Sequence, residues 1–189
     1  MSNKNIKSTK NNENINIKKR IMFNKDEDYY FITYNILIIL QTFGCKNEKT
    51  KWIDYTKLSY LIPFVSDSSL LDLLLHCLNS NRQPNQEEIE ILRESYIKSR
   101  LKLRLITSIL FALETNNLIT LKKNNKRHTI DIWLNQENIP SKLLNSDLFN
   151  IEKSNIKRLN NKIQRLKSLS VKTMLEKIFT DNGVRVWES

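Results

Sequence analysis

The feature that most constrains this chain is a change in the spacing of apolar residues within residues 101–134. In the first half, apolar residues recur every three or four positions, as on the buried face of a helix: Ile106, Ile109, Leu110 and Leu113. In the second half they recur at every second position, as on one face of a β-strand: Ile119, Leu121, Ile130 and Ile132. The stretch therefore predicts a helix that leads directly into a two-stranded hairpin.

The predicted hairpin has a consistent turn and register. Asn124 and Asn125 are acceptable at the two positive-φ positions of a two-residue turn. Such a turn pairs Ile119 with Ile130 and Leu121 with His128, and it places the four apolar strand residues on the face toward the helix. Asn116 and Asn117 tolerate the left-handed backbone that ends a helix where no Gly is present. A helix ending in LETNNLI followed by a basic-tipped hairpin resembles the last helix and wing of a winged-helix domain.

Three helices are expected ahead of this stretch. The first follows residue 28 and closes at Gly44 as a C-cap. The second is capped by Asp54 and should kink or end at Pro63, because proline has no N–H to donate. Ser66 is expected to cap the third, which runs to residue 79.

A fourth helix is expected to open at Pro84 and Asn85, and residues 86–117 contain neither Gly nor Pro. One continuous helix would be about 48 Å long at 1.5 Å per residue; a break near Ser99 is the alternative. A DNA-reading helix normally presents its N-terminal end to the major groove. A continuous helix would block that end, which argues against sequence-specific DNA reading.

The C-terminal part of the chain contains a short apolar stripe with a 3-4-3 spacing, formed by Ile156, Leu159, Ile163 and Leu166. At under two heptads it is too short to indicate a coiled coil. The stripe either packs back on the body or docks a partner helix, which makes these four residues candidate partner-binding positions. A last helix is expected at VKTMLEKIF, and VRVWES is a candidate short strand.

The net charge of +11 is concentrated in two flanks. Residues 1–25 and residues 150–172 each carry seven Lys or Arg against one Glu, which leaves the remainder with 17 basic and 18 acidic residues. A polyanionic partner is one explanation for these basic flanks. The other is a genome rich in A and T, because Lys, Asn and Ile are all abundant. Residues 1–25 contain too few apolar residues to offset their ordering entropy and are expected to be a disordered basic tail.

The residues that enzyme chemistry requires are largely missing from the sequence. Gly44 and Gly183 are the two glycines, so no phosphate-cradling loop and no dinucleotide fingerprint can form. No GxSxG, HExxH or paired CxxC is present. His76 and Cys77 are neighbours on a helix, do not converge on one metal ion, and are expected to form a buried structural pair. We therefore expect no enzyme activity, no cofactor and no metal site.

The expected location is the cytoplasm. No apolar run reaches the roughly 18 residues that a membrane span requires, and no apolar segment of a secretory signal follows the basic N-terminus. Cys45 and Cys77 are expected to be free thiols.

Two surfaces are candidate binding sites. The hairpin tip carries Lys122, Lys123, Lys126 and Arg127, next to His128, a composition suited to phosphate contact. A stripe on the long helix contains Arg100, Arg104, Ser108, Phe111 and Thr115. Its two arginines could approach phosphates, and Phe111 is a candidate protein-contact anchor. The alternatives are a solvated charged turn for the tip and wider core packing for Phe111.

Three segments resemble a known family: FITYNILIILQTFG, DYTKLSYLIPFVSD and ITSILFALETNNLITL, the last with its wing. They are similar in helix order and apolar pattern to the middle component of ABC-three-component (Lamassu-type) defence systems, over about residues 29–134. The resemblance implies a non-enzymatic subunit that assembles with an SMC-like coiled-coil ATPase and an effector, often a nuclease. Such a complex acts in bacterial immunity against phage or plasmids. The resemblance implies no catalytic residues.

The fold expected from these patterns is mainly α with a small β-hairpin. A winged-helix-like domain is expected at residues 26–139, with its wing at 118–134, followed by a C-terminal helical appendage at 140–189. The first hypothesis for function is a non-catalytic accessory subunit of an SMC-like ATPase defence complex that bridges partner proteins. The alternative is a stand-alone winged-helix regulator or replication protein that binds DNA.

Overall fold

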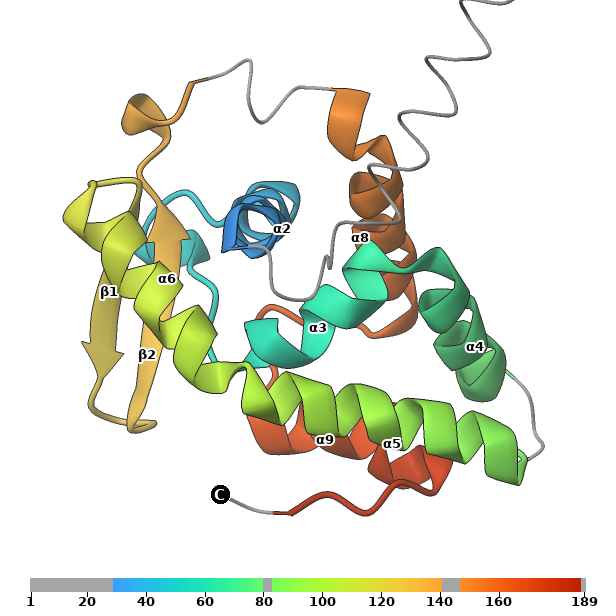
Figure 1. Cartoon of the computed structure of the whole chain (residues 1–189). Coiled ribbons are helices and arrows are strands. Elements are labelled where there is room, and N and C mark those ends of the chain that lie inside the picture. The colour runs from blue at the N-terminus through green and yellow to red at the C-terminus, as the bar shows by residue number, and fades with distance from the viewer. Residues whose placement is uncertain (1–28, 80–82, 141–146, 188–189) are drawn as a thin grey trace, which may run out of the picture.

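The computed structural model describes residues 29–79, 83–140 and 147–187. This part of the chain forms seven α-helices and one antiparallel hairpin (Figure 1). The helices are α2 (Tyr29–Thr42), α3 (Lys57–Ser66), α4 (Ser68–Asn79), α5 (Gln86–Leu101), α6 (Leu103–Thr115), α8 (Asn150–Lys162) and α9 (Val171–Ile178). The strands are β1 (Ile119–Asn124) and β2 (Thr129–Leu134). The predicted basic tail at residues 1–25 lies outside the described residues.

Helix α2 lies at the centre of the molecule, between the α6–hairpin unit and α8 (Figure 1). It is apolar around most of its circumference, which is the pattern of a helix enclosed on all sides. Its buried apolar residues are Ile32, Ile36, Leu37, Ile38, Ile39 and Leu40. The helix is followed by Gly44 in the left-handed conformation, with φ of 65°, so the predicted C-cap is confirmed.

Helices α3 and α4 depart from the predictions. The Asp54 carboxylate accepts the N–H of Thr56 ahead of α3, but the N-cap residue is Thr56 and no side chain caps the helix, so the predicted cap at Asp54 is wrong. Helix α3 also continues through Pro63 to Ser66, because this proline removes a single intrahelical donor and the flanking residues are buried in the core. Ser66 therefore belongs to α3, and Asp67 caps α4 by accepting the N–H groups of residues 69 and 70.

Helices α5 and α6 are separate, and the chain changes direction between them (Figure 1). Asn85 and Glu88 form a reciprocal capping box at the start of α5, as the predicted start at Asn85 requires. The alternative of a break near Ser99 is therefore confirmed and the continuous helix is wrong: the break falls three residues after Ser99, at Lys102, with ψ of −6°. The hydroxyl of Ser99 donates to the Ser95 carbonyl, and Ser99 is fully buried within α5. Because α5 leads into α6 across one residue, the N-terminal end of α6 is not free.

The hairpin forms where it was predicted, but with another register. Ile119 pairs with Leu134 and Leu121 with Ile132, so four residues, 125–128, connect the strands. Left-handed backbone occurs at His128, with φ of 54°, and not at the two predicted asparagines. The predicted turn and register are therefore wrong. Because the strand partner shifts by four residues, an even number, the same apolar side chains still share one face.

The segment between α2 and α3 covers the outer edge of β2. Trp52 and Ile132 exchange two backbone hydrogen bonds, of 2.8 and 2.9 Å, and Tyr55 N–H donates to the Ile130 carbonyl. On the outer edge of β1, the Glu114 carboxylate accepts the N–H of Leu121 at 2.8 Å. Such cover keeps the strand edges from pairing with another chain.

The C-terminal segment completes the same core and is not an appendage. Helix α8 packs on α2, α3 and α4. The side chain of Lys57 is fully buried, and its ammonium donates to the carbonyls of Leu166, Lys167 and Leu169, each at 2.9 Å. This lysine ties the turn after α8 to the start of α3. Residues 184–187 form no strand, contrary to the prediction for VRVWES.

Among the described residues, no single helix is both long and apolar enough to span a membrane. Helices α3 and α4 meet that criterion when taken together, but they are bent by 108° at their junction.

Candidate nucleic-acid interface

A buried carboxylate, that of Asp131, holds the hairpin in place. It pairs with the Lys51 ammonium at 2.9 Å and accepts hydrogen bonds from the Asn124 amide at 2.9 Å and the Asp54 N–H at 3.2 Å. Burial acts to raise the pKa of Asp131, but these donors outweigh it and hold the pKa below its usual value. The carboxylate therefore stays charged and fixes the hairpin against the segment before α3.

The predicted cations of the hairpin tip divide into two groups. The Lys122 ammonium pairs with Glu48 and lowers the pKa of that carboxyl, and Arg127 donates to the Ser168 carbonyl at 3.4 Å. Lys123 and Lys126 are exposed, and within the described residues their ammonium groups have no ion-pair or hydrogen-bond partner. Lys123 and Lys126 are therefore the tip cations most available to a ligand.

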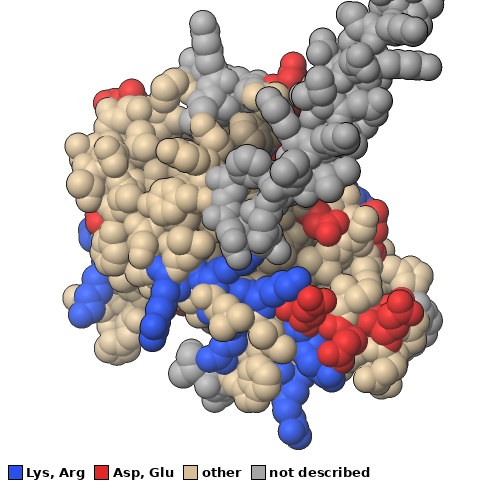
Figure 2. Space-filling view, viewed as in Figure 1, with Lys and Arg blue, Asp and Glu red and all other residues tan. Residues whose placement is uncertain are grey.

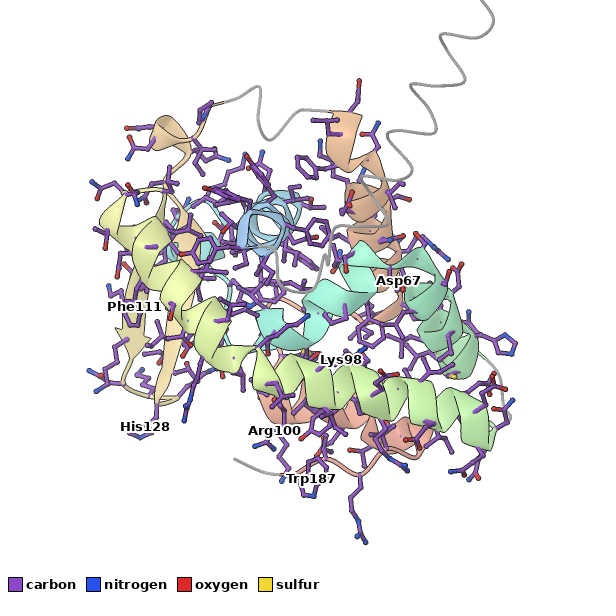
Figure 3. The ribbon with its side chains drawn as sticks, viewed as in Figure 1. Asp67, Lys98, Arg100, Phe111, His128 and Trp187 are labelled. Carbon is purple, nitrogen blue, oxygen red and sulfur yellow. The ribbon has the colours of Figure 1, made fainter. Side chains whose placement is uncertain are left out.

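The two arginines of the stripe on the long helix also differ in whether they are already bonded within the protein. Arg104 is exposed on α6, and its guanidinium has no partner in the part of the chain that the structure describes. Arg100 donates to the Trp187 carbonyl at 2.9 Å and to the Tyr96 hydroxyl at 3.2 Å. Arg100 is thus engaged in holding the C-terminal tail, beside which it lies in Figure 3, and it is a weaker candidate for phosphate contact than predicted.

Phe111 is exposed, as expected for a contact residue, with 53% of its surface open to solvent. The alternative of wider core packing is therefore wrong for this ring. In Figure 3, Phe111 on α6 and His128 at the far end of the hairpin lie on the same side of the molecule.

The stripe predicted as a second partner-binding surface is inside the core. Ile156, Leu159, Ile163 and Leu166 are all buried, so the alternative in which the stripe packs on the body is confirmed. A partner cannot reach these side chains while this fold is intact. The helix ends at Lys162, and the turn that follows it, with Arg165 at φ of 58°, directs the second half of the stripe into the core.

Positive charge gathers in one part of the face that Figure 2 shows. Figure 2 shows Lys and Arg side chains over the bend between α5 and α6 and near the end of the hairpin, while Asp and Glu lie along the N-terminal half of α5. With Arg104 on α6 and with Lys123 and Lys126 on the hairpin, this side presents free cations from two elements. We call Arg104, Phe111, Lys123 and Lys126 the α6–hairpin face.

Several residues of this region were missed by sequence reasoning. Leu101 is 77% exposed at the bend, and Trp187 is 54% exposed at the end of the C-terminal tail. The Tyr96 hydroxyl donates to the Trp187 carbonyl at 3.2 Å and accepts its N–H at 3.0 Å. The sequence signals that could have identified these residues are unusual residue types. Trp187 is a Trp in a polar tail, and Lys57, which ties the C-terminal segment to α3, is a cation at the start of an apolar helix.

The described residues contain no group of three or more His, Cys, Asp or Glu side chains that could hold a metal ion. Cys45 is a buried free thiol, and burial raises its pKa to about 12, which leaves it a poor nucleophile. Cys77 is buried but His76 is exposed, so the predicted buried pair is wrong for the histidine.

Comparisons with known proteins found no match: no family model, no curated protein and no solved structure is similar to this chain.

Proposed function

We propose that this chain is a non-catalytic, winged-helix-type binding protein whose α6–hairpin face contacts the phosphates of double-stranded DNA. The observation that carries the proposal is the path of the chain from α2 to the hairpin. A segment after α2 bridges to β2 through Trp52 and Ile132, and α6 leads directly into the two strands. This order resembles that of a winged-helix domain, with α4 and α5 as additional helices, and it supports the proposal.

The distribution of charge supports contact with the DNA backbone. Arg104, Lys123 and Lys126 are exposed and lie on the two elements that winged-helix proteins turn toward DNA. Phosphate contacts position a protein but do not read bases. Because α5 abuts the start of α6, the end that would enter the major groove is covered, so the proposed binding is independent of sequence.

The test compares two triple variants of the full chain for duplex binding at several salt concentrations. The variant Arg104→Ala, Lys123→Ala, Lys126→Ala should bind more weakly. The slope of the logarithm of its binding constant against the logarithm of the salt concentration should be shallower by about 0.9 for each phosphate that the variant no longer neutralises. The control variant Lys157→Ala, Lys162→Ala, Lys177→Ala removes the same charge from α8 and α9. Equally weakened binding by both variants would reject the α6–hairpin face as the DNA-binding surface.

A second candidate function, the subunit of an SMC-like ATPase defence complex that the resemblance implies, is supported by exposed apolar side chains. Leu101 and Trp187 are more than half exposed and lie beside Arg100. Trp and Arg are enriched at the centres of protein interfaces, and Leu101 adds exposed apolar surface next to them. We expect co-expression with neighbouring genes to yield a stoichiometric complex that Leu101→Glu disrupts. Leu148→Glu, at another exposed leucine, is the control. A protein that stays without partners would reject this function.

A further inference from the structure

A groove lies between α6 and the far half of the hairpin. It has a volume of about 420 Å³ and is lined by Phe111, Leu121, Lys123, His128, Thr129 and Ile130. In Figure 3, Phe111 marks its α6 wall and His128 its hairpin end. A volume of this size falls in the range of small-molecule sites.

The groove exists because α6 covers one end of the hairpin more fully than the other. Near the base of the hairpin, Ile119 and Leu134 are buried. Farther along, Leu121 and Ile130 are only half-buried, and Lys123 is exposed opposite Ile130. The groove therefore has an apolar floor, an aromatic wall in Phe111, and a cationic rim.

Cations predominate around the groove. Lys123 lines it, Lys126 lies in the adjoining loop, and Arg104 is two helical turns before Phe111, on the same side of α6. Glu114, which accepts the N–H of Leu121, places one negative charge beside these three cations, and Asp131 is buried in its pair with Lys51. A ligand that fits this groove combines a flat apolar ring with an anionic group.

One component of DNA has this chemistry, namely a nucleotide whose base is not paired. Resting on the proposed function, we infer that the groove takes one unpaired nucleotide of the bound DNA, with its base stacked on Phe111 and its phosphate held by Lys123. The His128 ring can donate a hydrogen bond at the same rim. Phosphate contacts alone would treat a continuous duplex and a duplex with a bulged base alike, so this inference adds a preference for unpaired sites.

The test measures fluorescence anisotropy of two DNAs at one salt concentration: a continuous duplex, and the same duplex with one bulged adenine. Stacking of a base on an aromatic side chain contributes about 1–3 kcal/mol, so we expect the wild-type protein to bind the bulged DNA about fivefold more tightly or better. Phe111→Ala should abolish this preference, so that the variant binds the bulged and the continuous DNA with equal affinity. Phe111→Trp should retain the preference. Ile151→Ala, at an exposed apolar residue of α8, is the control and should also retain it.

The outcomes separate this inference from the proposed function. Equal binding of the two DNAs by the wild-type protein would overturn the inference, while binding of the continuous duplex would still support the proposed function. Absence of binding to either DNA would reject both. If an acidic peptide containing Phe or Trp binds and Phe111→Ala abolishes its binding, while the bulge gives no preference, the groove is a protein-docking site and the inference is wrong.

Discussion

The helical stretch at residues 101–115 and the stretch at residues 150–172 both combine apolar residues at helical spacing with cations between them, but their surroundings differ. In the first stretch Leu101 and Phe111 remain exposed. In the second, the four stripe residues are buried, and the cations Arg158 and Lys162 contact Asp72 and Asn79 of α4. A basic, amphipathic pattern therefore becomes core or binding face according to which elements lie opposite it.

Acceptors on neighbouring elements decide which cations are already bonded within the protein. Helix α4 offers a carboxylate and an amide to the cations of α8. On the hairpin, Glu48 pairs with Lys122, and the Ser168 carbonyl accepts a hydrogen bond from Arg127. Arg104, Lys123 and Lys126 are left as the cations that a ligand can neutralise.

The largest expected effect on stability comes from truncating a buried residue of α8, and a matching truncation in α6 should have almost none. Leu159→Ala removes a buried side chain of α8 and should lower the free energy of unfolding by about 2–5 kcal/mol. Phe111→Ala removes an exposed ring and should change it by less than about 0.5 kcal/mol. Urea denaturation of both variants is the measurement. Similar destabilisation of the two variants would mean that Phe111 is part of the core.

The next effect concerns the lysine that joins the C-terminal segment to the body. Lys57→Met keeps the aliphatic stem but leaves three carbonyls without their donor, and we expect the free energy of unfolding to fall by about 3 kcal/mol in urea denaturation. Lys157→Met, at an exposed lysine of α8, serves as the control. A Lys57→Met protein as stable as the wild type would show that the C-terminal segment does not depend on these bonds.

The same lysine predicts a dependence of stability on pH. Burial lowers the pKa of Lys57 to about 7, despite the nearby carboxylates of Asp54 and Asp131, whereas an unfolded lysine has a pKa of about 10.4. Between these values the unfolded chain binds a proton that the folded chain does not, so the free energy of unfolding should rise with pH from about 7 to about 10. Chemical denaturation across this window should show the rise in wild type and a smaller one in Lys57→Met. The same dependence of the free energy of unfolding on pH in the wild type and in Lys57→Met would contradict this prediction.

A smaller stability effect than that of Lys57→Met is expected at the hairpin anchor. Asp131→Asn removes the charge that Lys51 neutralises and weakens the bonds from Asn124 and Asp54, at a cost of about 1.5 kcal/mol. Hydrogen exchange should show faster opening of the hairpin amides than of those in α8. Uniform acceleration across the chain would indicate that Asp131 supports the whole fold and not the hairpin alone.

Local signals predicted much of the fold. Apolar spacing located the helices and both strands, and Gly44 and Asn85 marked helix ends because capping depends on neighbouring residues. The hairpin register was not predicted from local residues, and a contact that accompanies it, the bridge between Trp52 and Ile132, joins residues 80 positions apart in the chain.

The candidate site was predicted less completely, for the same reason. Phe111 and the tip lysines were identified from residue type and spacing. The engagement of Lys122 by Glu48 and of Arg100 by Trp187 joins residues 74 and 87 positions apart. Such partners are set by the tertiary fold and leave no mark in a local pattern.

The most direct test of the proposed α6–hairpin face is a map of amide chemical shifts by NMR during titration of the full chain with duplex DNA. We expect the largest changes in α6 and in residues 122–130, with α8 unchanged despite its many cations. Changes centred on α8 or on the α3–α4 junction, or no change in the hairpin at saturating DNA, would contradict the proposal.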